Sequence, residues 1–393
     1  MKEVVEKLEI GEREAIQNII ANALKMGGAF SLWRKPNSTE KVLMICNSGS
    51  VELDEISLEE SVPGFVFAPF DPSQKKIFLT ADIVFRFSMG KLQETNPDHR
   101  WWTTFDKREN EVPQKLKYHL KPGRDSSPSN YQELVQLGIK KIEEGELEKI
   151  VPSRFQEVTL AEDFDILQTF HTLCEKHPQA MVSLVSSTAT GTWLGATPEL
   201  LVSIDKNSKF KTHALAGTQP YHSSINVKSV AWTQKEIEEQ ALVSRYIINC
   251  FKKIRVREYL EHGPKTVVAG NVMHLKTDYE VDMNEINFPQ LGSVMLKLLH
   301  PTSAVCGMPL EPALNFLRKY EGYDREFYSG HLGPINFDNE SHVFVNLRCL
   351  QLMESSARLY AGAGVTLDSN PEKEFLETEM KMRNLIVLIA PQS

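Results

Sequence analysis

The chain has 393 residues, a formal net charge of −8 and 41% hydrophobic residues, which is ample material for a folded core. Its acidic balance, with no run rich in Lys and Arg, argues against nucleic acid or an anionic membrane surface as the main partner. The N-terminus lacks the apolar segment of a signal peptide and no stretch approaches the length of a membrane span, so we expect a cytoplasmic protein.

The cysteines are too scattered to indicate a disulfide framework or a zinc site. They are Cys46, Cys174, Cys250, Cys306 and Cys349. Their number is odd and no CxxC spacing occurs, so we expect buried thiols.

The first third of the chain predicts one helix followed by short strands. The helix is expected over residues 2–24, and the strands over 29–34, 41–46, 65–70 and 75–87. No chemical motif occurs in this part. The turn-rich run KPGRDSSPSN at 121–130 predicts a linker or an exposed loop.

The remainder alternates helices with strands that come mostly in consecutive pairs. Helices are predicted near 130–145, 163–177, 234–261, 287–299 and 310–319. Strands are predicted at 180–187, 191–204, 209–217, 342–353 and 357–367. This order favours an α+β fold with largely antiparallel sheets over a doubly wound parallel sheet.

A final helix begins near residue 370 and carries charges on its apolar face. Asn370 is a good N-cap and Pro371 suits the first helical position. At about 100° per residue, Glu374, Glu377 and Lys381 share one narrow sector with the apolar residues that follow. Charges directed at the interior need partners, whereas surface decoration by i,i+4 pairs is the ordinary alternative.

A second helix also directs a carboxylate inward. Thr233 and Glu236 form a capping box that fixes its start, which places Glu239 on the apolar stripe. Inward acids on two helices, with no His or Cys cluster, suggest a hard-cation site for Mg²⁺ or Ca²⁺. The alternative is a set of buried salt bridges to Lys or Arg.

Other single residues carry weaker signals. Glu199 follows a proline inside an apolar strand pattern, and burial in such a strand would raise the pKa of its carboxyl. Alternation in HVFVNLRC predicts Phe344, Asn346 and Arg348 on one face of a strand, where the arginine would suit a carboxylate. A lysine such as Lys149 is most often a solvated strand edge.

Taken in order, eight blocks resemble the signatures of one family. They are KIVPSR, GATPELLV, ALAGTQ, KEIEEQALVSRYI, LHPTSAVCGMP, YDREFYSGHLG, VNLRC and RLYAGAGVTLDSNPEKEFLETEMKMR. The chain thus resembles the chorismate-utilising enzymes, the isochorismate, salicylate, anthranilate and aminodeoxychorismate synthases. The match covers roughly residues 130 to 390, and ordered blocks are more specific than any single motif.

The resemblance implies a fold and a site. It implies one large domain over residues 1–393 with two packed, largely antiparallel sheets flanked by helices and the active site in a cleft that holds Mg²⁺. Its catalytic part would be about 130–393, and the part over about 1–120 carries no motif. Lys149 would be the general base and Glu199 the general acid.

The resemblance also assigns the remaining site residues. Glu239 and Glu377 would be metal ligands, and Glu374 would act directly or through a metal-bound water. The substrate contacts would be Gly217, Thr218, His300, Arg348, Tyr360, Gly362, Gly364 and Lys381. On its own, His300 beside a proline is more often structural than catalytic.

Lys149 separates the members of this family. A lysine at this position is similar to that of the members that add water, whereas the ammonia-using members have glutamine there. We therefore expect an isochorismate synthase acting on chorismate, for menaquinone or siderophore biosynthesis, with no glutaminase subunit. A salicylate synthase, which goes on to eliminate pyruvate, is the nearest alternative; a non-catalytic protein that kept the fold would not need Lys149, Glu199 and the inward acids.

Overall fold

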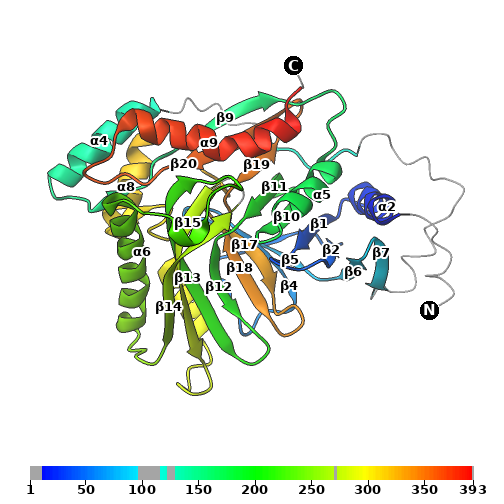
Figure 1. Cartoon of the computed structure of the whole chain (residues 1–393). Coiled ribbons are helices and arrows are strands. Elements are labelled where there is room, and N and C mark those ends of the chain that lie inside the picture. The colour runs from blue at the N-terminus through cyan, green and yellow to red at the C-terminus, as the bar shows by residue number, and fades with distance from the viewer. Residues whose placement is uncertain (1–10, 96–115, 122–128, 270–271, 392–393) are drawn as a thin grey trace, which may run out of the picture.

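The computed structural model describes residues 11–95, 116–121, 129–269 and 272–391. Two nine-stranded sheets pack face to face, and helices cover their outer surfaces (Figure 1). Every strand pairing found in these two sheets is antiparallel. The predicted α+β fold with two packed antiparallel sheets is therefore confirmed.

The strands of each sheet come from distant parts of the chain. The first sheet has, in order, β7 (Lys91–Thr95), β6 (Ile83–Ser88), β2 (Lys41–Cys46), β1 (Ala29–Arg34), β10 (Met181–Ser187), β11 (Gly191–Thr197), β19 (Cys349–Leu352), β20 (Ser356–Gly362) and β9 (Ser153–Thr159). The second has β14 (Leu260–Ala269), β15 (Val272–Asp282), β13 (Lys209–Pro220), β12 (Leu200–Ile204), β18 (Ser341–Val345), β17 (His331–Ile335), β4 (Gly64–Ala68), β5 (Lys76–Thr80) and β3 (Val51–Leu53). A two-stranded ladder joins β16 (Gly307–Met308) to β8 (Lys149–Ile150). The N-terminal third thus contributes strands to both large sheets.

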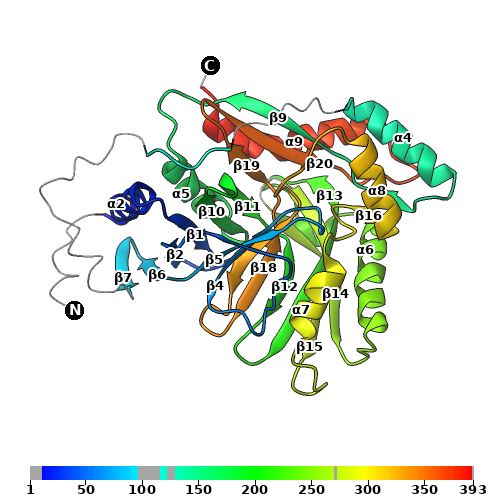
Figure 2. The same ribbon diagram turned by 180° about the vertical axis from the view of Figure 1, so that it is seen from behind.

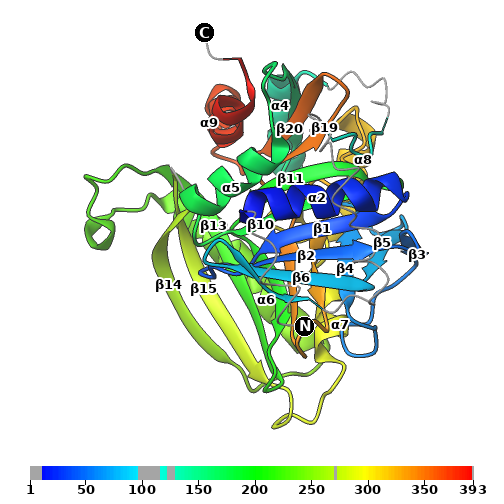
Figure 3. The same ribbon diagram turned by 90° about the vertical axis from the view of Figure 1, so that its right-hand side faces the viewer.

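Helices pack on both outer faces. They are α2 (Glu12–Lys25), α4 (Tyr131–Glu143), α5 (Ile166–Lys176), α6 (Gln234–Lys253), α7 (Leu291–Leu299), α8 (Leu310–Tyr320) and α9 (Pro371–Ile389), with a 3₁₀ turn η1 (Val227–Ser229). On the first sheet, α2 lies along β1 (Figure 3), α5 lies on β10 and β11, and α9 lies on β20 and β9. On the second sheet, α6 packs on β13 and β15, and α7 packs on β12 (Figure 2).

Strand β2 shows how the sequence builds these layers. Successive side chains of a strand point to opposite faces. Leu43 and Ile45 pack in the cluster beneath the helices, whereas Val42, Met44 and Cys46 pack in the cluster between the sheets. A continuous apolar run therefore fits a strand that is buried on both sides.

The chain crosses between the two sheets at several places, and two of these crossings are neighbours. One crossing runs from β11 through Pro198 and Glu199 into β12, and the other runs from β18 through 346–348 into β19. The Val345 N–H donates to the Glu199 carbonyl over 2.9 Å, which ties the crossings together. Glu199 and Arg348 therefore arise from adjacent backbone between the sheets.

Several predicted elements are confirmed and others are wrong in extent. The strands predicted at 29–34 and 41–46 are β1 and β2. The helix predicted over 2–24 appears as α2, while residues 1–10, and 122–128 of the predicted loop, lie outside the described residues. The run predicted at 75–87 is two strands, β5 and β6.

The helix predicted over 234–261 ends at Lys253. Arg255 has a φ of +62°, a left-handed conformation that stops a helix, and β14 begins at Leu260. The strands predicted at 191–204 and 342–353 are each two strands in different sheets.

The predicted face of Phe344, Asn346 and Arg348 is also wrong. The strand ends at Val345, and Arg348 has a φ of +49°. Alternation between faces applies only while the backbone stays extended, so it does not reach Arg348.

Candidate active site

A cavity of about 100 Å³ lies at the paired crossings between the sheets. It brings together most of the residues expected at the site. These are Glu199, Gly217, Thr218, Glu239, Arg348, Tyr360, Gly362, Gly364, Glu377 and Lys381. They come from the crossings, β13, β20 and the loop after it, α6 and α9, which are far apart in the sequence.

Lys149 lies directly behind one carboxylate of this cavity. Its side chain is 0% exposed, and its Nζ donates to Glu239 Oε1 over 3.1 Å. A Cβ added at Gly364 would come within 2.3 Å of the same oxygen, so a larger residue there would have to displace the Glu239 carboxylate from its present position. Burial would raise the pKa of Glu239, but the charge and hydrogen bond of Lys149, together with the charges of Lys381 and Lys235, outweigh burial and lower the pKa.

Glu377 and Lys381 form a second pair on α9. Lys381 Nζ lies 2.7 Å from Glu377 Oε1 and also donates to the Gly362 carbonyl over 2.9 Å. Both side chains are 23% exposed and line the cavity. The pair therefore stands at the edge of the cavity and holds the end of β20 to α9.

Glu374 forms a third pair, away from the cavity lining. Its side chain is 1% exposed and lies 2.6 Å from the Nζ of Lys235, on α6. Burial keeps the pKa of Glu374 above its ordinary value despite the lysine. The prediction that Glu374 points inward is confirmed, and its partner joins α9 to α6.

Each of the three expected metal ligands is thus paired with a lysine. The alternative of buried salt bridges describes the structure as it stands. Within the described ranges, no group of three or more His, Cys, Asp or Glu side chains is arranged to hold a metal ion. The oxygen donors of Glu239 and Glu377 on one cavity nevertheless fit the chemistry of Mg²⁺, provided that they exchange their lysines for the ion.

Glu199 is a buried acid beside three cations. Burial raises its pKa to about 7, although the charges of Lys149, Lys381 and Arg348 oppose the shift. The residue is 8% exposed and lines the cavity. A carboxyl with this pKa can donate a proton near neutral pH.

Arg348 is oriented by a histidine that the sequence did not single out. Arg348 Nη2 lies 3.0 Å from His274 Nε2, and His274 Nδ1 lies 2.8 Å from the Gly217 carbonyl. Arginine and the carbonyl fix the neutral tautomer with the proton on Nδ1. Burial and the charge of Arg348 lower the pKa of His274 to about 3. No element was predicted at His274, which belongs to β15, so no pattern indicated this contact.

Two further residues complete the polar lining on this side. Thr218 Oγ1 lies 3.4 Å from His274 Nδ1. Gly217 has a φ of +69° at the point where the register of β13 and β15 shifts, and a glycine adopts that conformation readily. The bulge turns the Gly217 carbonyl toward His274, so the backbone itself positions the chain of contacts that ends at Arg348.

Aromatic rings form another wall. Tyr360 is stacked on Tyr328 with ring centroids 5.1 Å apart and on Trp193 at 5.5 Å. Its hydroxyl donates to Gln351 Oε1 over 2.8 Å. The ring is therefore fixed at the cavity with its hydroxyl already engaged.

His300 is not among the described residues that line the cavity. Its Nε2 lies 3.1 Å from the Pro69 carbonyl oxygen, and its ring packs edge-on against His331 at 4.5 Å. The structure therefore places His300 in a buried contact with the chain before β5 rather than at the cavity.

A buried ion pair supports the cavity wall from behind. Arg325 pairs with Glu321 at 2.7 Å, and both side chains are 2% exposed. The same guanidinium donates to the carbonyls of Val151 and Val305, two residues that line the cavity. The Ser153 N–H also donates to Glu321 over 2.7 Å, so the pair ties β9 and the segment before β16 together.

Comparison with known proteins identifies the family. Residues 68–390 match the model of the family described as "Chorismate binding enzyme". The chain therefore belongs to the chorismate binding enzymes, which confirms the resemblance of its signature blocks.

No helix among the described residues is long and apolar enough to cross a membrane.

Similar proteins within the family are named isochorismate synthases. Isochorismate synthase DhbC of Bacillus subtilis (strain 168) is 30% identical over 294 residues, which is 72% of this chain and 72% of that protein. Isochorismate synthase EntC of Escherichia coli (strain K12) is 26% identical over 246 residues, 61% of this chain and 62% of that protein.

Solved structures share the fold. MenF, the menaquinone-specific isochorismate synthase of Escherichia coli, matches with a TM-score of 0.73 and 21% identity, covering 95% of this chain and 91% of that one. Anthranilate synthase component I of Streptococcus pneumoniae TIGR4 matches with a TM-score of 0.64 and 17% identity, covering 91% and 89%.

Proposed function

We propose that this chain is an isochorismate synthase that converts chorismate to isochorismate with the help of Mg²⁺. The observation that carries the proposal is a buried carboxyl, Glu199, that lines the cavity between the sheets, with a buried lysine, Lys149, directly behind the Glu239 carboxylate of the same cavity. The names of similar curated proteins support the same activity.

In this reaction water adds at C2 of the ring as the C4 hydroxyl leaves. Lys149 takes a proton from the attacking water, which requires that its contact with Glu239 is broken and that its side chain has given up a proton to become the neutral amine. Glu199 gives a proton to the departing hydroxyl, so one water enters, one leaves and no oxidant is needed. A carboxyl pKa of about 7 leaves a large share of Glu199 protonated at neutral pH.

Substrate carboxylates would be held by cations of the cavity. Arg348 offers a planar fork that matches a carboxylate, and His274 presets its direction. Lys381 would bind the second carboxylate after leaving Glu377. The rings of Tyr360 and Tyr328 give the substrate ring a flat wall.

Glu239 and Glu377 would hold Mg²⁺, with Glu374 as a further acid reached directly or through water. The ion, when bound, supplies positive charge that neutralises and orients a substrate carboxylate. If the ion replaced the lysines as the partner of these two carboxylates, Lys149 would be released to act on water and Lys381 to bind the substrate.

Isotope labelling tests the route of the oxygen atom. Conversion of chorismate in H₂¹⁸O should give isochorismate with one ¹⁸O in its ring hydroxyl, because the new hydroxyl comes from water. Unlabelled isochorismate would mean that the hydroxyl migrates within the substrate, and Lys149 would then have no water to activate.

A further inference from the structure

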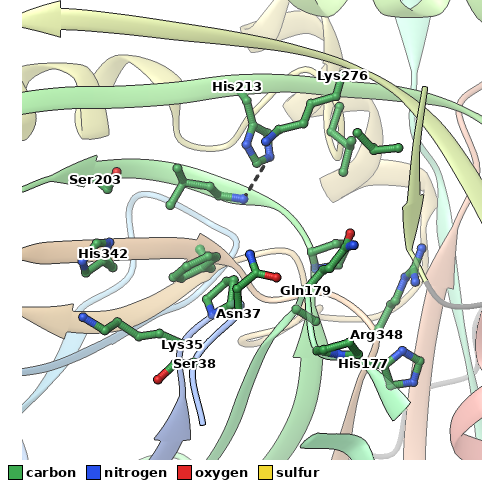
Figure 4. Close-up of a pocket in the computed structure, with 18 of the residues that line it drawn as sticks. Lys35, Asn37, Ser38, His177, Gln179, Ser203, His213, Lys276, His342 and Arg348 are labelled. Atoms are coloured by element: carbon green, nitrogen blue, oxygen red, sulfur yellow. Dashed lines mark hydrogen bonds between the residues drawn. The ribbon is translucent and has the colours of Figure 1, made fainter. Parts of the chain in front are cut away.

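A larger cavity of about 600 Å³ lies on the other side of Arg348. We call it the basic groove. Pro198, Leu215 and Arg348 line both this groove and the candidate active site. Its remaining walls come from the connection between β1 and β2, the end of α5, and strands β12, β13, β14, β15 and β18 (Figure 4).

Positive charge gathers in the groove although the whole chain carries −8. Four cationic side chains line it, Lys35, Lys176, Lys276 and Arg348, against the single carboxylate of Glu340. Lys35 Nζ lies 3.2 Å from Glu340, so this acid is already used. This local excess of positive charge attracts anions, although the chain as a whole is acidic.

The nearest outside carboxylate does not cancel this surplus. Asp278 lies 2.7 Å from Lys276 and also 2.7 Å from Lys265. One negative charge is therefore shared by two lysines. Lys276 keeps part of its field directed into the groove.

Neutral hydrogen-bond donors accompany the charges. His213 Nε2 accepts from the Leu200 N–H over 3.1 Å, as the dashed line in Figure 4 marks, so the ring proton sits on Nδ1. Burial and the charge of Lys276 lower the pKa of His213 to about 3, and burial with Arg348 lowers that of His177 to about 4. Both rings therefore stay neutral and donate from a single nitrogen.

Apolar residues make up another part of the lining, beside the polar side chains of Asn37, Ser38, Gln179, Ser203 and His342. Leu200, Leu215, Val267, Val268 and Phe344 supply surface for a ring or short hydrocarbon body. The volume lies within the range of small-molecule sites, about 300 to 1,000 Å³.

We propose that the basic groove binds a small organic acid, a carboxylate carried on a ring, with its carboxylate directed at Arg348. Because Arg348 serves both cavities, occupation of the groove competes for the group that holds the substrate. Two sources share this chemistry: the enzyme's own substrate on its way in, and a separate ring acid that inhibits. Only the first source rests on the proposed function.

Two kinds of variant test the groove without touching the candidate active site. Lys176→Glu combined with Lys276→Glu reverses its charge, and Val268→Trp fills its volume without changing charge. Lys206→Glu combined with Lys252→Glu, two exposed lysines outside the groove, is the matched control for charge. Benzoate is the probe, titrated by NMR against each folded protein, and chorismate kinetics are measured on the same set.

Benzoate should bind at least tenfold more weakly to both groove variants than to wild type and to the control. If the groove variants also have a lower kcat/KM for chorismate and an unchanged kcat, the groove is the entry path of the substrate. If the groove variants lose only their inhibition by benzoate, the groove binds a separate acid. Equal benzoate affinity and equal kcat/KM in all proteins would overturn the proposal. If the wild-type protein binds benzoate in the groove but does not convert chorismate, that result would contradict the proposed function and leave the proposal for the groove standing.

Discussion

Lys149 donates to Glu239 over 3.1 Å from a side chain that is wholly buried. The contact joins the expected base to an expected metal ligand. Neither residue can act in its proposed role while the contact persists. In the proposed mechanism, metal binding by Glu239 and base activity of Lys149 would therefore be coupled through one hydrogen bond.

Lys149→Ala should reduce turnover by about 10²- to 10⁴-fold, the usual contribution of a positioned base. Chorismate should still bind, because the cations of Arg348 and Lys381 remain. Steady-state kinetics and an equilibrium titration of chorismate measure the two effects. Lys140→Ala, on the exposed face of α4, is the control and should stay active. Full activity in Lys149→Ala would remove the base from the mechanism.

Glu199→Gln should lose the reaction with the fold intact, since an amide gives no proton to the leaving hydroxyl. In wild type, the acid form exists below the pKa of about 7, so kcat/KM should fall as pH rises through that value. A pH profile of wild type from 5 to 9 checks the direction. Near-normal turnover in the variant would reject Glu199 as the acid.

The same residue should leave a mark on stability. The pKa of Glu199 in the folded protein, about 7, lies above the ordinary value of 4.5. The stabilising contribution of Glu199 to the free energy of unfolding is therefore fully present below pH 4.5 and is lost as pH rises through 7. Between pH 5 and 8, Glu199→Gln should therefore gain up to about 3 kcal/mol over wild type in the free energy of unfolding. Urea titrations at each pH measure the difference, and a constant difference would contradict the raised pKa.

Glu377→Ala should raise the Mg²⁺ concentration needed for half-maximal activity by at least about tenfold, because one oxygen ligand is lost. Activity measured across a Mg²⁺ titration gives the shift. Glu372→Ala, on the exposed face of the same helix, should leave the titration unchanged. An unaltered Mg²⁺ requirement in Glu377→Ala would take the residue out of the metal site.

His274→Phe should raise KM for chorismate about tenfold and change kcat less, because Arg348 loses the acceptor that orients it. His274→Gln, which keeps an acceptor, should recover part of the loss. The split between KM and kcat separates positioning from a general loss of folded protein. Equal kinetics for the Phe and Gln variants would mean that the hydrogen bond does not set Arg348.

Arg325→Met should lower the free energy of unfolding by about 3 to 5 kcal/mol, because Glu321 is left charged and buried. Replacing both residues by Met should recover a large part, since no unpaired charge remains. Urea unfolding of the single and double variants measures this. A double variant no more stable than the single one would contradict the account.

The end of the chain shows what periodicity alone can predict. The predicted N-cap is confirmed, because the Asn370 side chain accepts from the N–H groups of Glu372 and Lys373. Glu374 is buried, as its place on the apolar stripe predicts, while Glu377 and Lys381 lie at the edge of that stripe. Helix geometry fixes these angles locally, so no tertiary information was needed.

The partners of these residues could not be predicted in the same way. Lys235 is 139 positions from Glu374, and His274 is 74 positions from Arg348. Such contacts depend on which elements pack together, and β15 was not among the predicted strands. The prediction for Arg348 was wrong for a related reason. Its backbone is left-handed, which breaks the alternation between faces on which the prediction rested.

The most direct test of the central claim is incubation of the purified protein with chorismate and Mg²⁺, without ammonia or glutamine, followed by chromatography of the products. The proposed function predicts isochorismate as the only product, formed reversibly and abolished by EDTA. Salicylate with an equal amount of pyruvate would contradict the assignment in favour of a salicylate synthase. Chorismate left unconsumed would contradict catalysis altogether.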